Sequence, residues 1–336
     1  MPHISLAGGD AAFDCRDDDT ILRAGLRAGL GFPYECNVGS CGTCRFELLE
    51  GEVRHLRVDA PGWTERDKQR KRFLGCQSRP SGDCRIKVGL RDHYKSAHPP
   101  ARVRGRLFAI EDHTHDIREF RFRLSRPALF LPGQYALLYA PGVDGARPYS
   151  MCNVTSSGEE WHFQIKLVPG GAATSRLFGD AQLGDEFELD GPYGMAYLRE
   201  ASPRDILCLA GGSGLSPMIS IARAAATHPE LANRTLHFIY GGRAARDICG
   251  EPMLKELPGF GTRIFYHPAI SSPEPDPAAW SGRTGFVTDV AKELFGDGLA
   301  RFEIYFAGPP AMAEAVMRLV VEMKVPPGQV HYDQFY

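Results

Sequence analysis

The segment FPYECNVGSCGTC, residues 32–44, decides how the first part of the chain is expected to fold. Its cysteines, Cys36, Cys41 and Cys44, follow the pattern C-x4-C-x2-C, and a further cysteine, Cys76, lies in RFLGCQ. The residues between the first three are small, so backbone amides can fold closely over a bound group and donate hydrogen bonds to it. The spacing therefore predicts one site at which these thiolates converge.

This cysteine spacing is that of plant-type 2Fe-2S clusters held by thiolates alone. A zinc site is the alternative, but zinc sites usually combine two short C-x2-C units, and this sequence has only one. Rieske ligation needs two histidines, and none lies between residues 36 and 44. Cys84 is the other candidate for the last ligand, but it belongs to the alternating run CRIKV, which favours a strand position. We therefore expect four cysteines to hold the cluster: Cys36, Cys41, Cys44 and Cys76.

The composition excludes several classes of protein. A length of 336 residues allows two or three domains. Lys plus Arg number 39 against 41 for Asp plus Glu, so the net charge does not indicate a nucleic-acid or membrane-surface protein. The odd number of cysteines and the lack of a signal-peptide pattern argue against a disulfide framework. The most relevant long uncharged run, 206–222, is interrupted by glycines and a proline, so it is a poor membrane span. We expect a cytoplasmic protein without a membrane span.

Residues 1–97 are predicted to form one compact unit around the cysteine loop. Short runs at 3–6 and 13–16 indicate a hairpin, and Asp19 is expected to cap a following helix. The remaining cysteines are interpreted as small buried hydrophobic residues: Cys15, Cys84, Cys152, Cys208 and Cys249. The motifs FPYECNVGSCGTC and RFLGCQ resemble the N-terminal ferredoxin domain of bacterial multicomponent oxygenase reductases. That resemblance implies a β-grasp-like fold.

A second region, 98–200, follows a linker rich in polar residues and proline. The segments REFRFRL (118–124) and WHFQIKLV (161–168) alternate apolar and polar residues with a period of two. Several such segments, separated by Gly and Pro turns, predict an antiparallel sheet closed into a small barrel.

Two motifs within this region suit a flavin. Arg147, Tyr149 and Ser150 form R-x-Y-S, in which the ring can stack on an isoalloxazine and the guanidinium can hold a phosphate. Alone, this pattern also fits a turn with a paired arginine. Gly171 and Thr174 stand at a predicted helix start, where backbone amides can bind a pyrophosphate. In this order, and followed by GPYG, the motifs resemble the flavin domain of the ferredoxin–NADP reductase superfamily.

The resemblance implies that FAD binds here and places Tyr149 and Ser150 next to the reacting ring. The expected FAD contacts are Arg147, Tyr149, Ser150, Ile165, Lys166, Val168, Gly170, Gly171 and Thr174.

The third region, 201–336, alternates strands and helices, which predicts a doubly wound parallel sheet. A strand at 206–210 runs into GGSGLSP, where Ser216 is expected to cap a helix with Pro217 in its first turn. A glycine-rich turn at this position leaves room and amide dipoles for a pyrophosphate, although a tight turn without a ligand is the alternative.

Two later segments complete a nucleotide site. Arg243, in YGGRAARD, is placed to hold a 2′-phosphate or to line the ribose. The superfamily places the residues of YFAGPPAM beside the nicotinamide, and this chain has Ala307 where the superfamily often has Cys. The resemblance favours NADH and leaves NADPH open. The expected nucleotide contacts are Gly211, Gly212, Gly214, Pro217, Gly241, Arg243, Ala307, Gly308 and Pro309.

Two further expectations concern single residues. In the resembling reductases the C-terminal tail lies against the flavin, so Phe335 is expected to pack on the ring and to take part in catalysis; a frayed terminus is the alternative. His113 and His115 are a close pair without a third ligand, and we interpret them as surface residues.

The order of the regions, ferredoxin, FAD and NAD, resembles the reductase component of bacterial multicomponent oxygenases. The resemblance implies that NADH reduces FAD and that the 2Fe-2S cluster passes electrons to an oxygenase component or a Rieske-type ferredoxin in aromatic or hydrocarbon oxidation. A hydride carries two electrons and the cluster accepts one, so a flavin must separate them. A reductase for a pyridoxamine-bound deoxysugar and a 2Fe-2S redox sensor are the alternatives.

Overall fold

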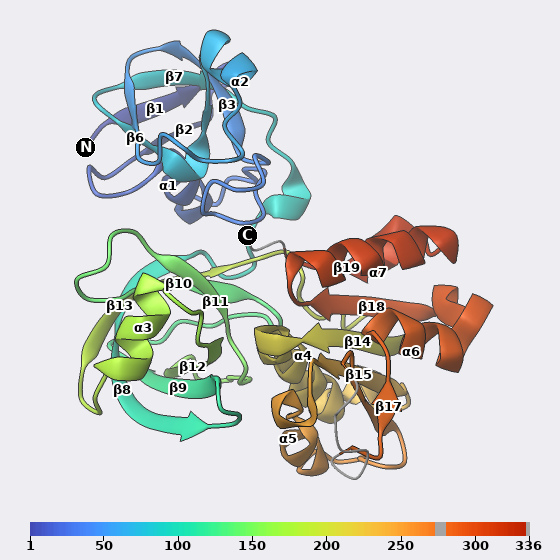
Figure 1. The fold of residues 1–336 in the computed structure, drawn as a ribbon. Helices are drawn as coiled ribbons and strands as arrows, with labels where there is room; N and C mark the ends of the chain where they lie inside the picture. Colours follow the sequence, from blue (N-terminus) through green and yellow to red (C-terminus); the bar gives the residue numbers. More distant parts are fainter. Residues whose placement is uncertain (273–279, 334–336) are drawn as a thin grey trace.

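The computed structural model describes residues 1–272 and 280–333. They form a mixed sheet at the N-terminal end, a six-stranded antiparallel barrel, and a parallel sheet covered by helices (Figure 1). This arrangement confirms the predicted fold class.

The N-terminal ferredoxin unit contains a five-stranded sheet in the order β2-β1-β7-β3-β5. Strand β1 pairs antiparallel with β2, as the predicted hairpin requires, and parallel with β7. Asp19 does not cap helix α1: the N-cap is Thr20, and its side chain makes no capping bond. The elements are β1 (His3–Leu6), β2 (Ala12–Asp14), α1 (Ile21–Arg27), β3 (Arg45–Glu50), β4 (Val53–His55), α2 (Glu65–Gln69), β5 (Arg72–Leu74), η1 (Gly75–Gln77), β6 (Ser78–Pro80) and β7 (Cys84–Lys87).

The barrel has the strand order β11-β10-β13-β8-β9-β12. A single bridge between Met151 and Phe163 joins its two ends, so the barrel is nearly closed. The alternating apolar residues predicted to face inward, such as Phe120, Phe122 and Trp161, are fully buried. The elements are η2 (Asp92–Tyr94), β8 (Ala101–Asp112), β9 (Ile117–Leu124), β10 (Tyr135–Tyr139), β11 (Arg147–Ser150), β12 (Glu160–Lys166), α3 (Ala172–Gly179) and β13 (Glu186–Tyr193).

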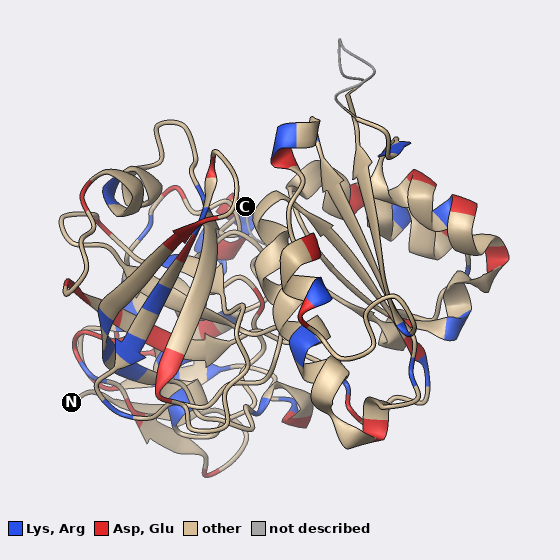
Figure 2. Ribbon diagram, turned by 90° about the horizontal axis from the view of Figure 1, so that it is seen from below, with Lys and Arg blue, Asp and Glu red and all other residues tan. Residues whose placement is uncertain are grey.

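The C-terminal sheet is parallel, with the order β17-β16-β15-β14-β18-β19. Alternate residues of β14 point into two separate cores: Cys208 packs with α4 and α5, and Leu207 packs with α6 and α7. Figure 2 shows charged residues of both signs on the helices, while the strands between them are mostly uncharged. Helices on both faces make this a doubly wound sheet.

The elements of this unit are β14 (Asp205–Gly211), η3 (Gly212–Gly214), α4 (Leu215–Thr227), η4 (Pro229–Leu231), β15 (Leu236–Gly242), η5 (Ala245–Asp247), α5 (Glu251–Lys255), β16 (Ile264–Ile270), β17 (Arg283–Thr284), α6 (Val287–Phe295), η7 (Gly296–Arg301), β18 (Phe302–Ala307), α7 (Pro310–Glu322), η8 (Pro327–Gln329) and β19 (Val330–His331). None of the helices in the described ranges combines the length and apolar character that a membrane crossing requires.

The ferredoxin unit and the barrel share one hydrophobic core. Tyr135, Leu137 and Tyr193 of the barrel are fully buried in the same cluster as Phe32 and Cys44 of the ferredoxin unit. The cysteine loop is therefore packed against the barrel rather than joined to it only by a linker.

Candidate functional site

Backbone amides of the cysteine loop donate hydrogen bonds to cysteine sulfurs. The amides of Ser40 and Cys41 both donate to the Cys36 Sγ at 3.3 Å. The amide of Cys76 donates to the Cys44 Sγ at 3.5 Å. Such donors favour the thiolate over the thiol, which is the form that binds metal. Three of these cysteines are buried, and Cys41 is partly exposed.

The sulfurs are arranged as two pairs. Cys36 and Cys41 interact through their side chains, which lowers the pKa of Cys41 to about 5 and raises that of Cys36. Cys44 and Cys76 interact in the same way. Within the described ranges, no group of three or more cysteines has its ligand atoms within 4.8 Å of one another, so the sulfurs do not surround a single ion. Two separated pairs fit the two irons of a 2Fe-2S cluster and disfavour the zinc alternative.

Glycines let the loop close over this site. Gly39 and Gly42 adopt φ values of +88° and +78°, a conformation that favours glycine. A Cβ added to Gly62 would lie 2.7 Å from the Gly42 amide nitrogen. Arg45 stabilises the segment that contains Gly62 and Asp67, because its guanidinium donates to the carbonyl of Gly62 at 2.8 Å and to the carboxylate of Asp67 at 3.0 Å. Larger residues at these glycines would push the loop away from the sulfurs.

Cys84, the other candidate for the last ligand, begins strand β7. Its thiol donates to the carbonyls of Glu52 at 3.4 Å and Gly82 at 3.3 Å. Cys84 therefore occupies a buried strand position. The other cysteines outside the cluster site are also buried: Cys15, Cys152, Cys208 and Cys249.

Strand β11 carries Arg147, Tyr149 and Ser150 at the edge of the barrel sheet. It pairs antiparallel with β10, so that Ser150 lies opposite Tyr135. Each of the three side chains is at least partly accessible. Burial raises the pKa of Tyr149 to about 12, so its hydroxyl keeps its proton. The R-x-Y-S residues thus lie together on one accessible edge, which fits a planar ligand with a phosphate attached.

Helix α3 begins at the second flavin motif. Its N-cap is Gly171, which provides no capping side chain, so the first helical amides remain available to an anion. Thr174 Oγ1 donates to the Gly171 carbonyl at 3.2 Å and holds the turn in place. Gly170 adopts a φ of +72° just before it. Of the other expected contacts, Ile165 is fully buried in the barrel core, so the structure does not place it on an accessible surface.

The glycine-rich turns at the carboxyl ends of β14 and β18 are pressed together. A Cβ added to Gly214 would lie 1.9 Å from the carbonyl oxygen of Ala307. Cβ atoms added to Gly211 and Gly308 would lie 2.8 and 2.4 Å from the Met312 sulfur. Only glycine fits at these places. Since β14 is the strand from which the sheet order extends in both directions, its carboxyl end is where doubly wound sheets bind nucleotides.

The remaining expected nucleotide contacts lie at the same sheet end. Arg243 is exposed just beyond β15, and its backbone amide donates to Asp247 Oδ2 at 3.0 Å. A Cβ on Gly241 would lie 2.7 Å from Val287. Pro217 is buried in the first turn of α4. Apart from the buried Pro217, the predicted residues named here lie at the carboxyl end of the parallel sheet.

Family models match three successive parts of the chain. The 2Fe-2S iron-sulfur cluster binding domain matches residues 4–81, the oxidoreductase FAD-binding domain matches 104–197, and the oxidoreductase NAD-binding domain matches 208–318. The chain therefore has domains for a 2Fe-2S cluster, FAD and NAD, as the sequence predicted.

Similar proteins share this whole arrangement. The ferredoxin–NAD(P)+ reductase CarAd of Metapseudomonas resinovorans is 36% identical over 98% of this chain and 98% of its own length. The ferredoxin–NAD(+) reductase component of the alkene monooxygenase system of Xanthobacter autotrophicus is 37% identical over 96% of this chain and 98% of its own. A solved structure of the ferredoxin reductase in carbazole 1,9a-dioxygenase superposes with a TM-score of 0.93 and 35% identity, covering 99% of this chain and 98% of that chain.

The chain belongs to the reductase components of multicomponent oxygenase systems.

The reductase has polar contacts between its domains that sequence reasoning missed. Ser216 does not cap α4, whose N-cap is Gly214; its hydroxyl donates to the Ser150 carbonyl at 2.6 Å. Further along α4, Ser220 donates to the Asn153 carbonyl at 2.8 Å. The helix therefore fastens the nucleotide domain to the end of the flavin-motif strand.

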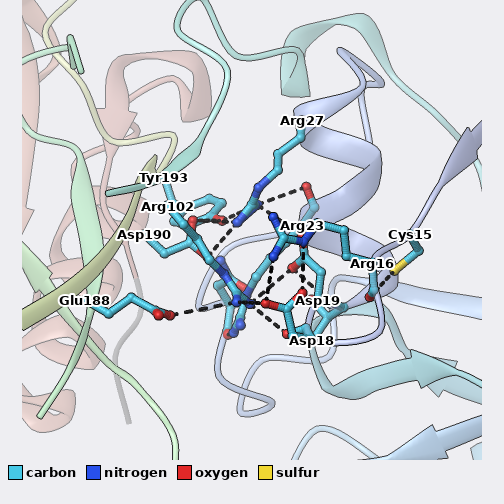
Figure 3. Close-up of polar contacts among 12 residues, drawn as sticks. Cys15, Arg16, Asp18, Asp19, Arg23, Arg27, Arg102, Glu188, Asp190 and Tyr193 are labelled. Carbon is cyan, nitrogen blue, oxygen red and sulfur yellow. Dashed lines mark hydrogen bonds and ion pairs between the residues drawn. The ribbon is translucent and has the colours of Figure 1, made fainter. Parts of the chain in front are cut away.

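A buried ionic network, the arginine network, joins the ferredoxin unit of the reductase to the barrel (Figure 3). Arg27 of α1 donates to both carboxylate oxygens of Asp190 in β13, each at 2.8 Å. Arg102 of β8 donates to Asp18 at 2.8 Å and also lies 3.7 Å from Asp19. Asp190 is fully buried, so these contacts fix the relative position of the two units.

Lys166 of the reductase lies between the barrel and the nucleotide turn. It forms an ion pair with Asp116, whose pKa is lowered by Lys166 although burial acts to raise it. Its aliphatic chain lies 3.5 Å from the position of a Cβ on Gly212. A second polar contact joins these two domains: His115 Nε2 of the barrel lies 3.8 Å from Asp247 Oδ1 of the nucleotide domain.

The interpretation of His113 as a surface residue was wrong. Its side chain is only 10% exposed and contacts Glu119 at 3.2 Å. Glu119 also accepts from Gln164 at 3.0 Å and from Arg121 at 2.6 Å. His115 is exposed, as expected. Phe335 lies outside the described residues.

Proposed function

We propose that this reductase transfers hydride from NADH to FAD and delivers electrons singly, through its 2Fe-2S cluster, to an oxygenase component or a Rieske-type ferredoxin. The observation that carries this proposal is the packing of the cysteine loop against strand β10, the neighbour of the flavin-motif strand β11. When bound, FAD supplies the ability to take two electrons and release them one at a time. The relatives named above serve a dioxygenase and a monooxygenase, so the acceptor belongs to a system of one of these kinds.

The roles of individual residues follow from their positions. Arg147 and the N-terminus of α3 hold the FAD phosphates, and Tyr149 and Ser150 orient the flavin ring. For Phe335, which lies outside the described residues, a role against the ring rests on the family resemblance alone. The glycine turns at the ends of β14 and β18 hold the nucleotide, with Arg243 toward the adenosine ribose.

The domain limits that we propose are 1–97, 98–200 and 201–336. The matched family segments fall within these limits. We place the protein in the cytoplasm, where NADH is available and where cysteines stay reduced.

An anaerobic titration with NADH, followed by absorbance and EPR, tests the proposal. The flavin takes up two electrons and the cluster one, so the EPR signal of a reduced 2Fe-2S cluster appears as the flavin bleaches. Cys76→Ser abolishes that signal and leaves flavin reduction intact. The matched control, Cys84→Ser, retains the signal because Cys84 is a strand residue. Failure of NADH to reduce the flavin, or loss of the signal in the control alone, would contradict the assignment.

A further inference from the structure

The segment around Cys36 is connected to the flavin domain on both sides of the cysteine, directly before it and through Arg23 of α1 after it. Before it, the hydroxyl of Tyr135 donates to the carbonyl of Glu35 at 2.6 Å. The Tyr34 hydroxyl, one residue earlier, accepts from the Gly194 amide at 3.1 Å. Both Tyr135 and Tyr34 are nearly inaccessible to solvent, so water does not compete for these bonds.

After Cys36, the contact runs through an arginine. Arg23 is 7% exposed, and its guanidinium donates to the side chain of Asn37 at 3.1 Å and to the backbone carbonyl of the same residue at 3.3 Å. The same guanidinium donates to the Tyr139 hydroxyl of the barrel at 3.0 Å. Asn37 adopts a φ of +56°, which the two bonds from Arg23 stabilise.

The two barrel tyrosines involved are the first and last residues of one strand, β10. Strand β10 is hydrogen-bonded along its length to β11, with Tyr135 opposite Ser150 and Leu138 opposite Arg147. The expected flavin contacts on β11 are thus paired with β10, and the tyrosines at the two ends of β10 are hydrogen-bonded toward the residues on either side of Cys36.

The other ligands of the cluster site are held differently. The hydrogen bonds described for residues 39–45 and 75–78 stay within the ferredoxin unit, as in the bond from the Gly75 amide to the Cys44 carbonyl at 2.8 Å. Of the four ligands, Cys36 is the one whose sequence neighbours on both sides are tied to the barrel.

We propose that Tyr135 and Arg23 are positioning residues that hold Cys36 as the flavin-facing ligand, so that the electron enters the cluster on the Cys36 side. The transfer moves one electron from the reduced flavin to the oxidised cluster and breaks no bond between heavy atoms. This inference rests on the proposed function.

The test is Tyr135→Phe, which removes only the hydroxyl, in the holo-reductase. Stopped-flow absorbance follows flavin reduction by NADH, and freeze-quench EPR follows cluster reduction. Cluster reduction is expected to slow about fivefold, because one hydrogen bond contributes about 1 kcal/mol and 1.4 kcal/mol corresponds to tenfold. Flavin reduction keeps its wild-type rate. Failure of flavin reduction in the wild type would instead refute the proposed function.

The matched control is Tyr266→Phe. Tyr266 is partly buried in β16, and its hydroxyl, like that of Tyr135, donates to a backbone carbonyl, that of Cys249, far from the cysteine loop in sequence. This variant is expected to reduce its cluster at the wild-type rate. Equal slowing in both variants would overturn the inference, because it would show a general effect of losing a hydrogen-bonded hydroxyl.

The reduction potential of the cluster gives a readout independent of turnover. Redox titration is expected to give the same potential and EPR spectrum for Tyr135→Phe as for the wild type, since the hydroxyl bonds a backbone carbonyl rather than a sulfur. A shifted potential, or an unchanged rate of cluster reduction, would refute the positioning role. If Tyr135→Phe does not retain its cofactors, Tyr139→Phe decides the question by the same measurements, because it removes the barrel contact of Arg23 and leaves the bonds from Arg23 to Asn37.

Discussion

The barrel has two interfaces, and they are built from different interactions. Toward the ferredoxin unit, Arg27 and Asp190 form a buried ion pair. Toward the nucleotide domain, neutral hydroxyls of α4 donate to backbone carbonyls, as Ser216 does to Ser150. Breaking a buried ion pair leaves an uncompensated charge, whereas removing a hydroxyl costs one hydrogen bond. The ferredoxin interface should therefore be much more sensitive to a single substitution.

The largest effect is expected at Asp190. Asp190→Asn keeps the size of the side chain but removes the closer charged partner of Arg27, at 2.8 Å, and leaves only Asp19 at 3.6 Å, which should cost about 3 kcal/mol. The measurement is the free energy of unfolding in urea, followed by the absorbance of the cluster. The control is Asp180→Asn, whose exposed pair with Arg176 should contribute under about 0.5 kcal/mol. Equal losses in the two variants would show that the buried pair has no special role.

A buried carboxyl, that of Asp333, lies near the same interface and predicts a dependence on pH. Asp333 accepts from the Met195 amide at 3.2 Å, and burial raises its pKa from 3.8 to about 7. Between these values the folded state keeps a proton that the unfolded state has lost. The contribution of Asp333 to stability is therefore complete at low pH and falls as pH rises toward 7, by about 1.4 kcal/mol per pH unit.

Asp333→Asn should remove that contribution. Urea unfolding of wild type and variant at a series of pH values gives the difference in unfolding free energy, which should change across this window and level off above it. A difference independent of pH would mean that Asp333 does not titrate there.

The smallest effect is expected at the nucleotide interface. Ser216→Ala removes the bond to the Ser150 carbonyl and the bond that the hydroxyl accepts from the Gln164 amide, and it should cost about 1–2 kcal/mol of unfolding free energy. The control is Thr227→Ala, because the Thr227 hydroxyl contacts only carbonyls of its own helix. A cost for Ser216→Ala as large as that for Asp190→Asn would erase the contrast between the interfaces.

Local patterns predicted most of the fold and the cofactor sites. The cysteine spacing and the period-two alternation act within short segments, so they can be recognised without knowing the tertiary structure. The arginine network could not be recognised from the sequence, because Arg27 and Asp190 are separated by 163 positions. The errors share this cause: Asp19 and Ser216 were expected to cap helices and instead lie against partners from another domain. His113 is a different case, because its partner Glu119 is near in sequence, in the next strand of the same barrel.

The contacts of α4 also bear on how the domains move. Ser216, Ser220 and Arg223 lie on one ridge of the helix and donate to three carbonyls at and just after the end of the flavin-motif strand, those of Ser150, Asn153 and Cys152. A rigid helix must release all of these bonds together to swing. Rotation of the nucleotide domain away from the barrel is thus a cooperative event.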